Sequence, residues 1–302
     1  MGRVKSATNT MVQQLDIFND SGDVMLRNDV LQALLRRDAA AASALRRALA
    51  TSYPDDGLLA VFATLIDALQ STATSRFASH AELVLAVHAV DHQFMPAAVA
   101  AFLPADATAW LAPLWTALAQ RATALPFDAG QPGAHAAALW LQAGCAAEAA
   151  AATATIPSWR RIPQPLAWMT EARLCSDGLD ATWPLLAELA WLAPARLDRF
   201  FTGPPDPLLQ RLYKAFAAQF EGDGSSADMA WFPAWVLTEK PALVPWLAAA
   251  EPGQQSEAEQ GFRLLLALIT LEKQGRHNEL IVKRQRLQGL HGGLYSAYMK
   301  SR

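Results

Sequence analysis

Two histidines have the most explicit metal-ligand spacing in the chain. His88 and His92 lie four residues apart in a predicted helix that also carries His80 and Glu82. Side chains at i and i+4 share one helix face, so two imidazoles in this pattern could chelate one ion. No other cluster of Cys or His offers a third ligand. We therefore predict no metal and no cofactor, with a metal-dependent enzyme built on the His88/His92 face as an alternative.

An aromatic ring beside two guanidinium groups is the second candidate. Trp159, Arg160 and Arg161 fall in a link that is predicted to be non-helical. Trp and Arg are favoured anchors at protein interfaces and on single-stranded nucleic acid. This segment could line a groove for an acidic peptide or a nucleic acid. The alternative is an ordinary loop between helices.

The third candidate is a pentapeptide near the N-terminus, Gln14-Leu15-Asp16-Ile17-Phe18. Its three apolar side chains could fill a hydrophobic groove, and the amide of Gln14 could make oriented hydrogen bonds. A short extended tail can order on binding without disturbing the folded domain. In the alternative interpretation the apolar side chains pack the tail onto the first helices, as a hydrophobic staple does.

This pentapeptide resembles the Gln-Leu-(Ser/Asp)-Leu-Phe motif with which bacterial replication and repair proteins dock onto the DNA polymerase sliding clamp. The resemblance covers these five residues, and Ile17 replaces the commonest Leu. It implies that the partner is the sliding clamp and that residues 14–18 form the partner-binding site.

Enzyme motifs with a recognisable mechanism are missing from the sequence. It has no Walker loop, no dinucleotide-binding glycine fingerprint, no Gly-x-Ser-x-Gly elbow and no Cys-x-x-Cys pair. The ten tryptophans mostly fall among Leu and Ala, a pattern typical of packing. We therefore predict that the protein is not an enzyme.

Composition then indicates which elements must position these residues. The chain contains 62 Ala and 43 Leu but only 12 Val and 6 Ile. Ala and Leu favour helices, whereas β-branched residues favour strands. Because 52% of the residues are apolar, a sizeable core can form. We predict an all-α fold without a significant β-sheet.

Pairs of apolar segments with small or acidic turns recur along the chain. Residues 136–142 and 146–155 flank Gly144, and residues 165–175 and 179–192 flank a Ser-Asp-Gly turn. The pairs end at Pro157 and Pro194, which are 37 residues apart, close to the tetratricopeptide period of 34. These units resemble degenerate tetratricopeptide-like hairpins. The resemblance implies an irregular α-solenoid of antiparallel helical hairpins that binds proteins or peptides.

Three regions are predicted along the chain. Residues 1–22 form a flexible tail with the linear motif, and residues 23–302 form the helical-repeat domain, with a subdivision near residues 203–207. Residues 273–302 carry a net charge of +6, so the remainder sums to −9. This basic end is predicted to be a solvated helix face, with direct nucleic-acid binding as an alternative.

The location is predicted from what the sequence lacks. Its apolar runs are shorter than the roughly 20 residues of a membrane-spanning helix, and residues 1–10 have no apolar core typical of a secretory signal. Two isolated cysteines are typical of a reducing compartment. We expect a cytoplasmic bacterial protein without a membrane partner. The sequence favours a non-enzymatic scaffold that docks onto the sliding clamp through its N-terminal tail. In the alternative, the protein is an adaptor for an unrelated partner and the tail is structural.

Overall fold

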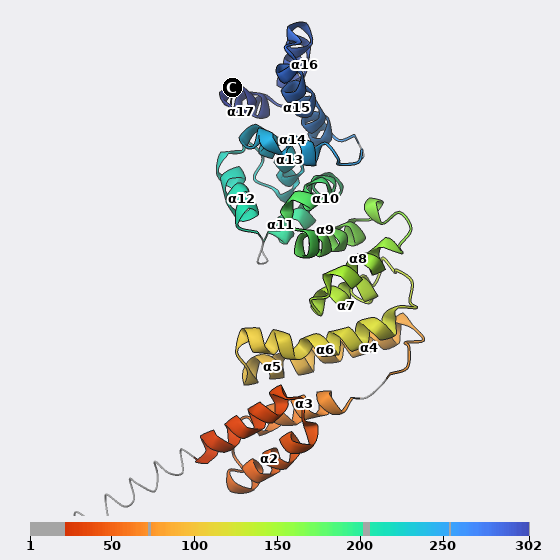
Figure 1. The fold of residues 1–302 in the computed structure, drawn as a ribbon, viewed down its shortest axis with the longest axis vertical. Helices are drawn as coiled ribbons and strands as arrows, with labels where there is room; N and C mark the ends of the chain where they lie inside the picture. Colours follow the sequence, from red (N-terminus) through yellow and green to blue (C-terminus); the bar gives the residue numbers. More distant parts are fainter. Residues whose placement is uncertain (1–21, 72–73, 202–205, 254, 302) are drawn as a thin grey trace, which may run out of the picture. The chain divides into compact units, whose positions relative to one another are not determined.

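Every regular element that the structure describes is a helix. The computed structural model describes residues 22–71, 74–201, 206–253 and 255–301. The all-α prediction is confirmed within these ranges. The ribbon shows these helices coloured in chain order (Figure 1). The chain divides into two compact units between Gly144 and Cys145.

The expected subdivision near residues 203–207 is not where this division falls. Residues 202–205 lie outside the described part. The helices on either side of them contribute Leu197, Leu209 and Leu212 to one core, which keeps both helices in the same unit.

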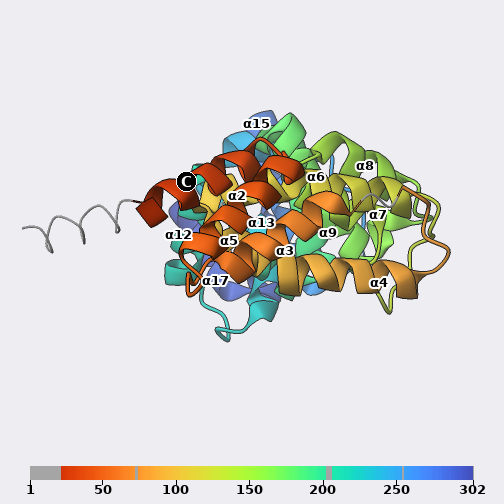
Figure 2. The same ribbon diagram turned by 90° about the horizontal axis from the view of Figure 1, so that it is seen from below.

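The first unit begins with a helix over residues 22–35, so Gly22 is already helical and does not end a tail. The elements that follow are α2 (Ala39–Ser52), α3 (Leu59–Gln70), α4 (His80–Ala89), η1 (Val90–Phe94), α5 (Met95–Ala101), α6 (Pro104–Ala122) and α7 (Ala136–Gln142). Helices α2 and α3 pack side by side (Figure 2). Helix α6 packs against α4, α5 and α7.

Local signals explain how the first helices begin and end. Arg37 adopts a positive φ of 57°, which ends the first helix. The Asp38 carboxylate then caps α2 by accepting a hydrogen bond from the Ala41 N–H at 2.9 Å. Trp110 of α6 donates from its indole N–H to the Leu34 carbonyl at 2.9 Å, while Arg37 donates to the Trp110 carbonyl at 2.8 Å. These reciprocal bonds fix the end of the first helix against α6.

Helix α4, the π-helical turn η1 and α5 run as one continuous helix over His80–Ala101. The helix begins at Ser79, whose hydroxyl accepts from the Glu82 N–H, and ends before Phe102. The π-helical turn Val90–Phe94 changes the direction in which the side chains that follow it point around the helix axis.

The second unit contains the remaining described helices. They are α8 (Ala146–Ala154), η2 (Trp159–Arg161), α9 (Pro163–Asp177), α10 (Leu179–Leu192), α11 (Pro194–Phe200), α12 (Pro207–Gln219), η3 (Ser226–Trp231), α13 (Phe232–Glu239), η4 (Pro241–Leu243), α14 (Val244–Leu247), α15 (Glu257–Gln274), α16 (His277–Leu290) and α17 (Gly292–Lys300).

Helix α10 lies at the centre of this unit and is buried along most of its length. It packs against α9, α11, α13 and α14. Trp183, Trp191 and Trp235 are buried in the same core, as the packing interpretation of the tryptophans predicts. Trp246 is the exception among these rings, because 46% of its surface is exposed.

The hairpins only partly follow the expected arrangement. Helices α9 and α10 pack together as the second predicted pair. In the first pair, by contrast, α7 packs against α6 in the first unit and α8 packs against α9 in the second. The turn at Gly144 therefore coincides with the unit boundary, and a regular series of hairpin repeats stays a prediction.

Candidate functional site

The pentapeptide Gln14–Phe18 lies outside the described residues, so the structure gives no account of these side chains. The described chain begins at Gly22, which packs closely against Tyr53 at the end of α2. A Cβ atom on Gly22 would lie 2.5 Å from the Tyr53 hydroxyl. The described chain therefore begins beside Tyr53, where Gly22 leaves no room for a side chain.

His88 and His92 are both exposed on the continuous helix His80–Ala101. Their ring centroids lie 4.1 Å apart, which confirms the prediction that the two side chains share one helix face. His80 points elsewhere, since its Nε2 lies 2.9 Å from the Pro126 carbonyl oxygen. Across the described ranges no group of three or more His, Cys, Asp or Glu side chains could hold a metal ion. The third ligand that a metal enzyme would need is therefore not found near this pair.

The same helix exposes apolar side chains on both sides of the histidine pair. The exposed fractions are 39% for Val84, 72% for Leu85 and 62% for Val99. In the described part of the chain, His80–Ala101 is also the one helix whose length and composition would allow it to cross a membrane. Only 22% of its most apolar window is buried. A large, exposed apolar helix face marks an interaction surface.

Trp159, Arg160 and Arg161 form the 3-10 turn η2, so the prediction of a non-helical link is wrong. The turn follows Ser158, whose positive φ of 55° reverses the chain. The Arg160 guanidinium lies over the Trp159 ring, 5.2 Å from its centroid. It also forms ion pairs with Glu251 and, at 3.3 Å, with Glu188.

The neighbouring Arg161 reaches the same loop. Its guanidinium donates to the Pro252 carbonyl at 2.6 Å. Both arginines therefore contact the loop before α15, and their positive charge is engaged within the chain itself. The proposed groove for an acidic partner stays a prediction, and the contacts present give this turn a structural role.

Glu188 is the buried centre of this network. Its carboxylate accepts from the Glu251 N–H at 2.9 Å as well as facing Arg160. Burial raises the pKa of Glu188 to about 7, although the nearby guanidinium groups of Arg160, Arg161 and Arg263 oppose the rise. The carboxyl therefore titrates near neutral pH while holding the loop by its backbone.

A second buried carboxylate holds the other end of the loop. Glu259 accepts from the N–H groups of Gly253 and Gln255, both at 2.8 Å, and lies 3.6 Å from Arg263. Arg263 in turn donates to the Ala250 carbonyl at 2.9 Å. The sequence reasoning missed this network. The signal was Glu188, a single carboxylate inside an otherwise apolar stretch of α10.

The basic C-terminal end divides into internal ion pairs and an open basic surface. Arg284 pairs with Glu272 at 3.0 Å, and Arg276 pairs with Glu279. Lys283 and Arg286, by contrast, line an open pocket of about 470 Å³ beside Arg263. A solvated basic face accounts for this arrangement, and nucleic-acid binding stays an alternative.

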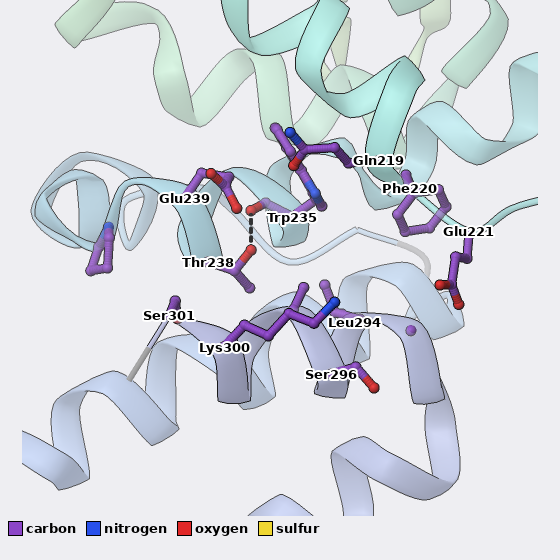
Figure 3. A pocket seen from close by; sticks show the side chains of 13 residues that line it. Gln219, Phe220, Glu221, Trp235, Thr238, Glu239, Leu294, Ser296, Lys300 and Ser301 are labelled. Carbon is purple, nitrogen blue, oxygen red and sulfur yellow. Dashed lines mark hydrogen bonds between the residues drawn. The ribbon is translucent and has the colours of Figure 1, made fainter.

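A pocket lies between the end of α12, helix α13 and helix α17 (Figure 3). It measures about 600 Å³. Trp235 and Phe220 form an apolar wall of the pocket. Charged side chains also line it, namely Glu221, Glu239 and Lys300. Thr238 is turned toward its own helix, where its hydroxyl donates to the Trp235 carbonyl at 2.7 Å. The lining is that of a mixed surface hollow without converging catalytic groups.

Comparison with known proteins adds no family to these observations. No protein-family model, no curated protein and no solved structure matches the chain.

Proposed function

We propose that this chain is a non-enzymatic protein-interaction scaffold that docks onto the DNA polymerase sliding clamp through Gln14–Phe18. The observation that carries the proposal is the pentapeptide itself, with its apolar anchors beside an amide. A helical body, arranged as an irregular solenoid of hairpins, would present this tail while binding a further partner. The proximity of residue 18 to the first described helix at residue 22 ties the clamp closely to that body.

The test measures binding of the full chain to a purified bacterial sliding clamp by surface plasmon resonance. Docking predicts a dissociation constant of about micromolar. Phe18→Ala together with Gln14→Ala should weaken it by about 30-fold or more, because removing an aromatic anchor typically costs about 2 kcal/mol.

A matched control changes residues on either side of the pentapeptide. Val12→Ala with Asn19→Ala shortens two tail side chains and leaves the five motif residues intact, so clamp affinity should stay within about twofold of wild type. Equal binding by the motif variant and the wild-type chain would contradict clamp docking.

The alternative is an adaptor for another protein in which the tail is structural. The close contact between Gly22 and Tyr53 favours it, because the described chain begins packed against the folded surface. Deleting residues 1–20 separates the two functions. Under clamp docking the melting temperature stays unchanged, whereas a structural tail predicts a drop of several degrees, the size of shift that about 1 kcal/mol produces.

A further inference from the structure

One face of the helix His80–Ala101 combines a histidine pair with exposed small and apolar residues on both sides. We call it the histidine face, and it consists of Ala81, Val84, Leu85, His88, His92, Pro96, Val99 and Ala100, all exposed. The opposite face is buried through Leu83, Val90 and Ala98. The histidine face is therefore a continuous strip with its imidazoles at the centre.

The two imidazoles are half of a zinc site. Zn²⁺ takes about four tetrahedral ligands and binds imidazole nitrogen at about 2.0–2.1 Å, so the two exposed rings, whose centroids lie 4.1 Å apart, can share one ion once their side chains rotate slightly apart. The described ranges contain no further ligand beside them. A complete site on this face therefore needs a second molecule that brings two more ligands.

The residue order on the face is close to a palindrome. If two copies pair antiparallel with the two-fold axis at the level of residue 90, each residue of one helix faces the residue of the other helix that is equally far from position 90 on its other side. His88 of one copy then faces His92 of the other, Val84 faces Pro96, and Ala81 faces Val99. Such self-complementarity is what an isologous dimer interface requires. We propose that two copies of this chain pair antiparallel through the histidine face and bind one Zn²⁺ between the four histidines.

Charge favours a cation between the copies. Residues 77–120 contain no Lys or Arg, and the exposed acids Glu82 and Asp91 flank the histidine face on the same helix. These carboxylates repel those of a second copy when two faces meet, and a divalent cation at the centre offsets that repulsion. The same charges disfavour a membrane, because Asp91 and two imidazoles would lie in the middle of the inserted segment.

The size of the face makes the dimer depend on the metal. From residue 81 to residue 100 the helix is about 28 Å long, and its contact strip is about 10–12 Å wide. Two copies would bury roughly 600 Å², against about 1,200 Å² for a stable interface. Apolar contact alone is therefore insufficient, and ligation must supply the remaining affinity.

The experiment measures the mass of the purified full chain by analytical ultracentrifugation, first in EDTA and then with zinc chloride. We expect a monomer in EDTA and a dimer with one zinc per two chains. Zinc should tighten self-association by about 100-fold or more. His88→Gln with His92→Gln should stay monomeric in zinc, with unchanged helix content by circular dichroism because both side chains are exposed.

His277→Gln is the matched control, since this exposed histidine at the start of α16 is not on the face and its loss should leave the dimer intact. A zinc dimer that survives in the double variant overturns the proposal, as does a monomer that binds one zinc per chain. Flotation of the chain with phosphatidylcholine vesicles in EDTA would assign the face to a membrane instead. Clamp binding does not involve these residues, so the double variant should retain it.

Discussion

A single residue, Glu188, links the stability of the second unit to pH. The pKa of this carboxyl in the fold is about 7, above its ordinary value of 4.5. The folded state therefore binds the proton more tightly than the unfolded chain does. The contribution of this group to stability is greatest below pH 4.5, declines as the pH rises to 7, and stays low above that.

Glu188→Gln should remove this decline. Relative to wild type, the free energy of unfolding of the variant should rise by up to about 3 kcal/mol between pH 4.5 and pH 8, from about 1.36 kcal/mol per pKa unit. Urea denaturation of both proteins across this range measures the difference. Asn278→Gln, which changes an exposed residue without a titratable group in α16, is the control, and its difference from wild type should not change with pH.

A second buried group acts in the opposite direction, which is why the difference between variants is needed. Burial lowers the pKa of His135 to about 4, and the charge on His80 adds to the effect. The neutral imidazole is favoured in the fold, so its contribution is present above pH 6.5 and is lost as the pH falls toward 4. Because His135 is the same in both proteins, its contribution cancels when the free energy of unfolding of wild type is subtracted from that of Glu188→Gln.

Helices illustrate what the sequence could predict. The bounds of α7 and α10 agree with the expected segments 136–142 and 179–192, because local signals mark where these helices begin or end. Asp38 caps α2, while Gly275, with a φ of 71°, ends α15. Helix α17 breaks the pattern. Gly292 and Gly293 have low helix propensity, yet His291 caps a new helix there by accepting the Leu294 N–H at 3.0 Å.

The candidate site was less predictable than the helices. The spacing of His88 and His92 predicted a shared face correctly, because helical periodicity is local. The partners of Arg160 and Arg161 lie about 90 residues later, at Glu251 and Pro252. No local pattern encodes such a pairing. The sequence therefore indicated that charge was concentrated in this turn but not what it contacts.

Two glycines in neighbouring helices should respond oppositely to the same substitution. A Cβ on Gly261 of α15 would lie 2.8 Å from the Trp231 ring, whereas one on Gly289 of α16 would meet nothing within 4 Å. Gly261→Ala should destabilise the fold by about 1–3 kcal/mol through overpacking. Gly289→Ala should stabilise it by up to about 1 kcal/mol through helix propensity. Chemical denaturation measures both, and equal effects would contradict the close packing at Gly261.

The whole chain consists of two units, each with its own buried residues. A unit with its own core can fold independently. We predict that fragments 1–144 and 145–302, expressed separately, each keep their helices and unfold cooperatively. Circular dichroism and thermal denaturation test this. An unfolded 1–144 fragment would show that the division at Gly144 does not separate independent domains.

The hydrogen bond from Arg161 to the Pro252 carbonyl can form only late in the synthesis of the chain. During synthesis the turn at residue 161 emerges long before its acceptor, which lies 91 residues further along the chain. At about 5–20 residues per second, that interval lasts roughly 5–20 s. Throughout it, Arg160, Arg161 and Glu188 lack the loop that they contact in the finished protein. The second unit therefore completes its fold only after most of it has left the ribosome.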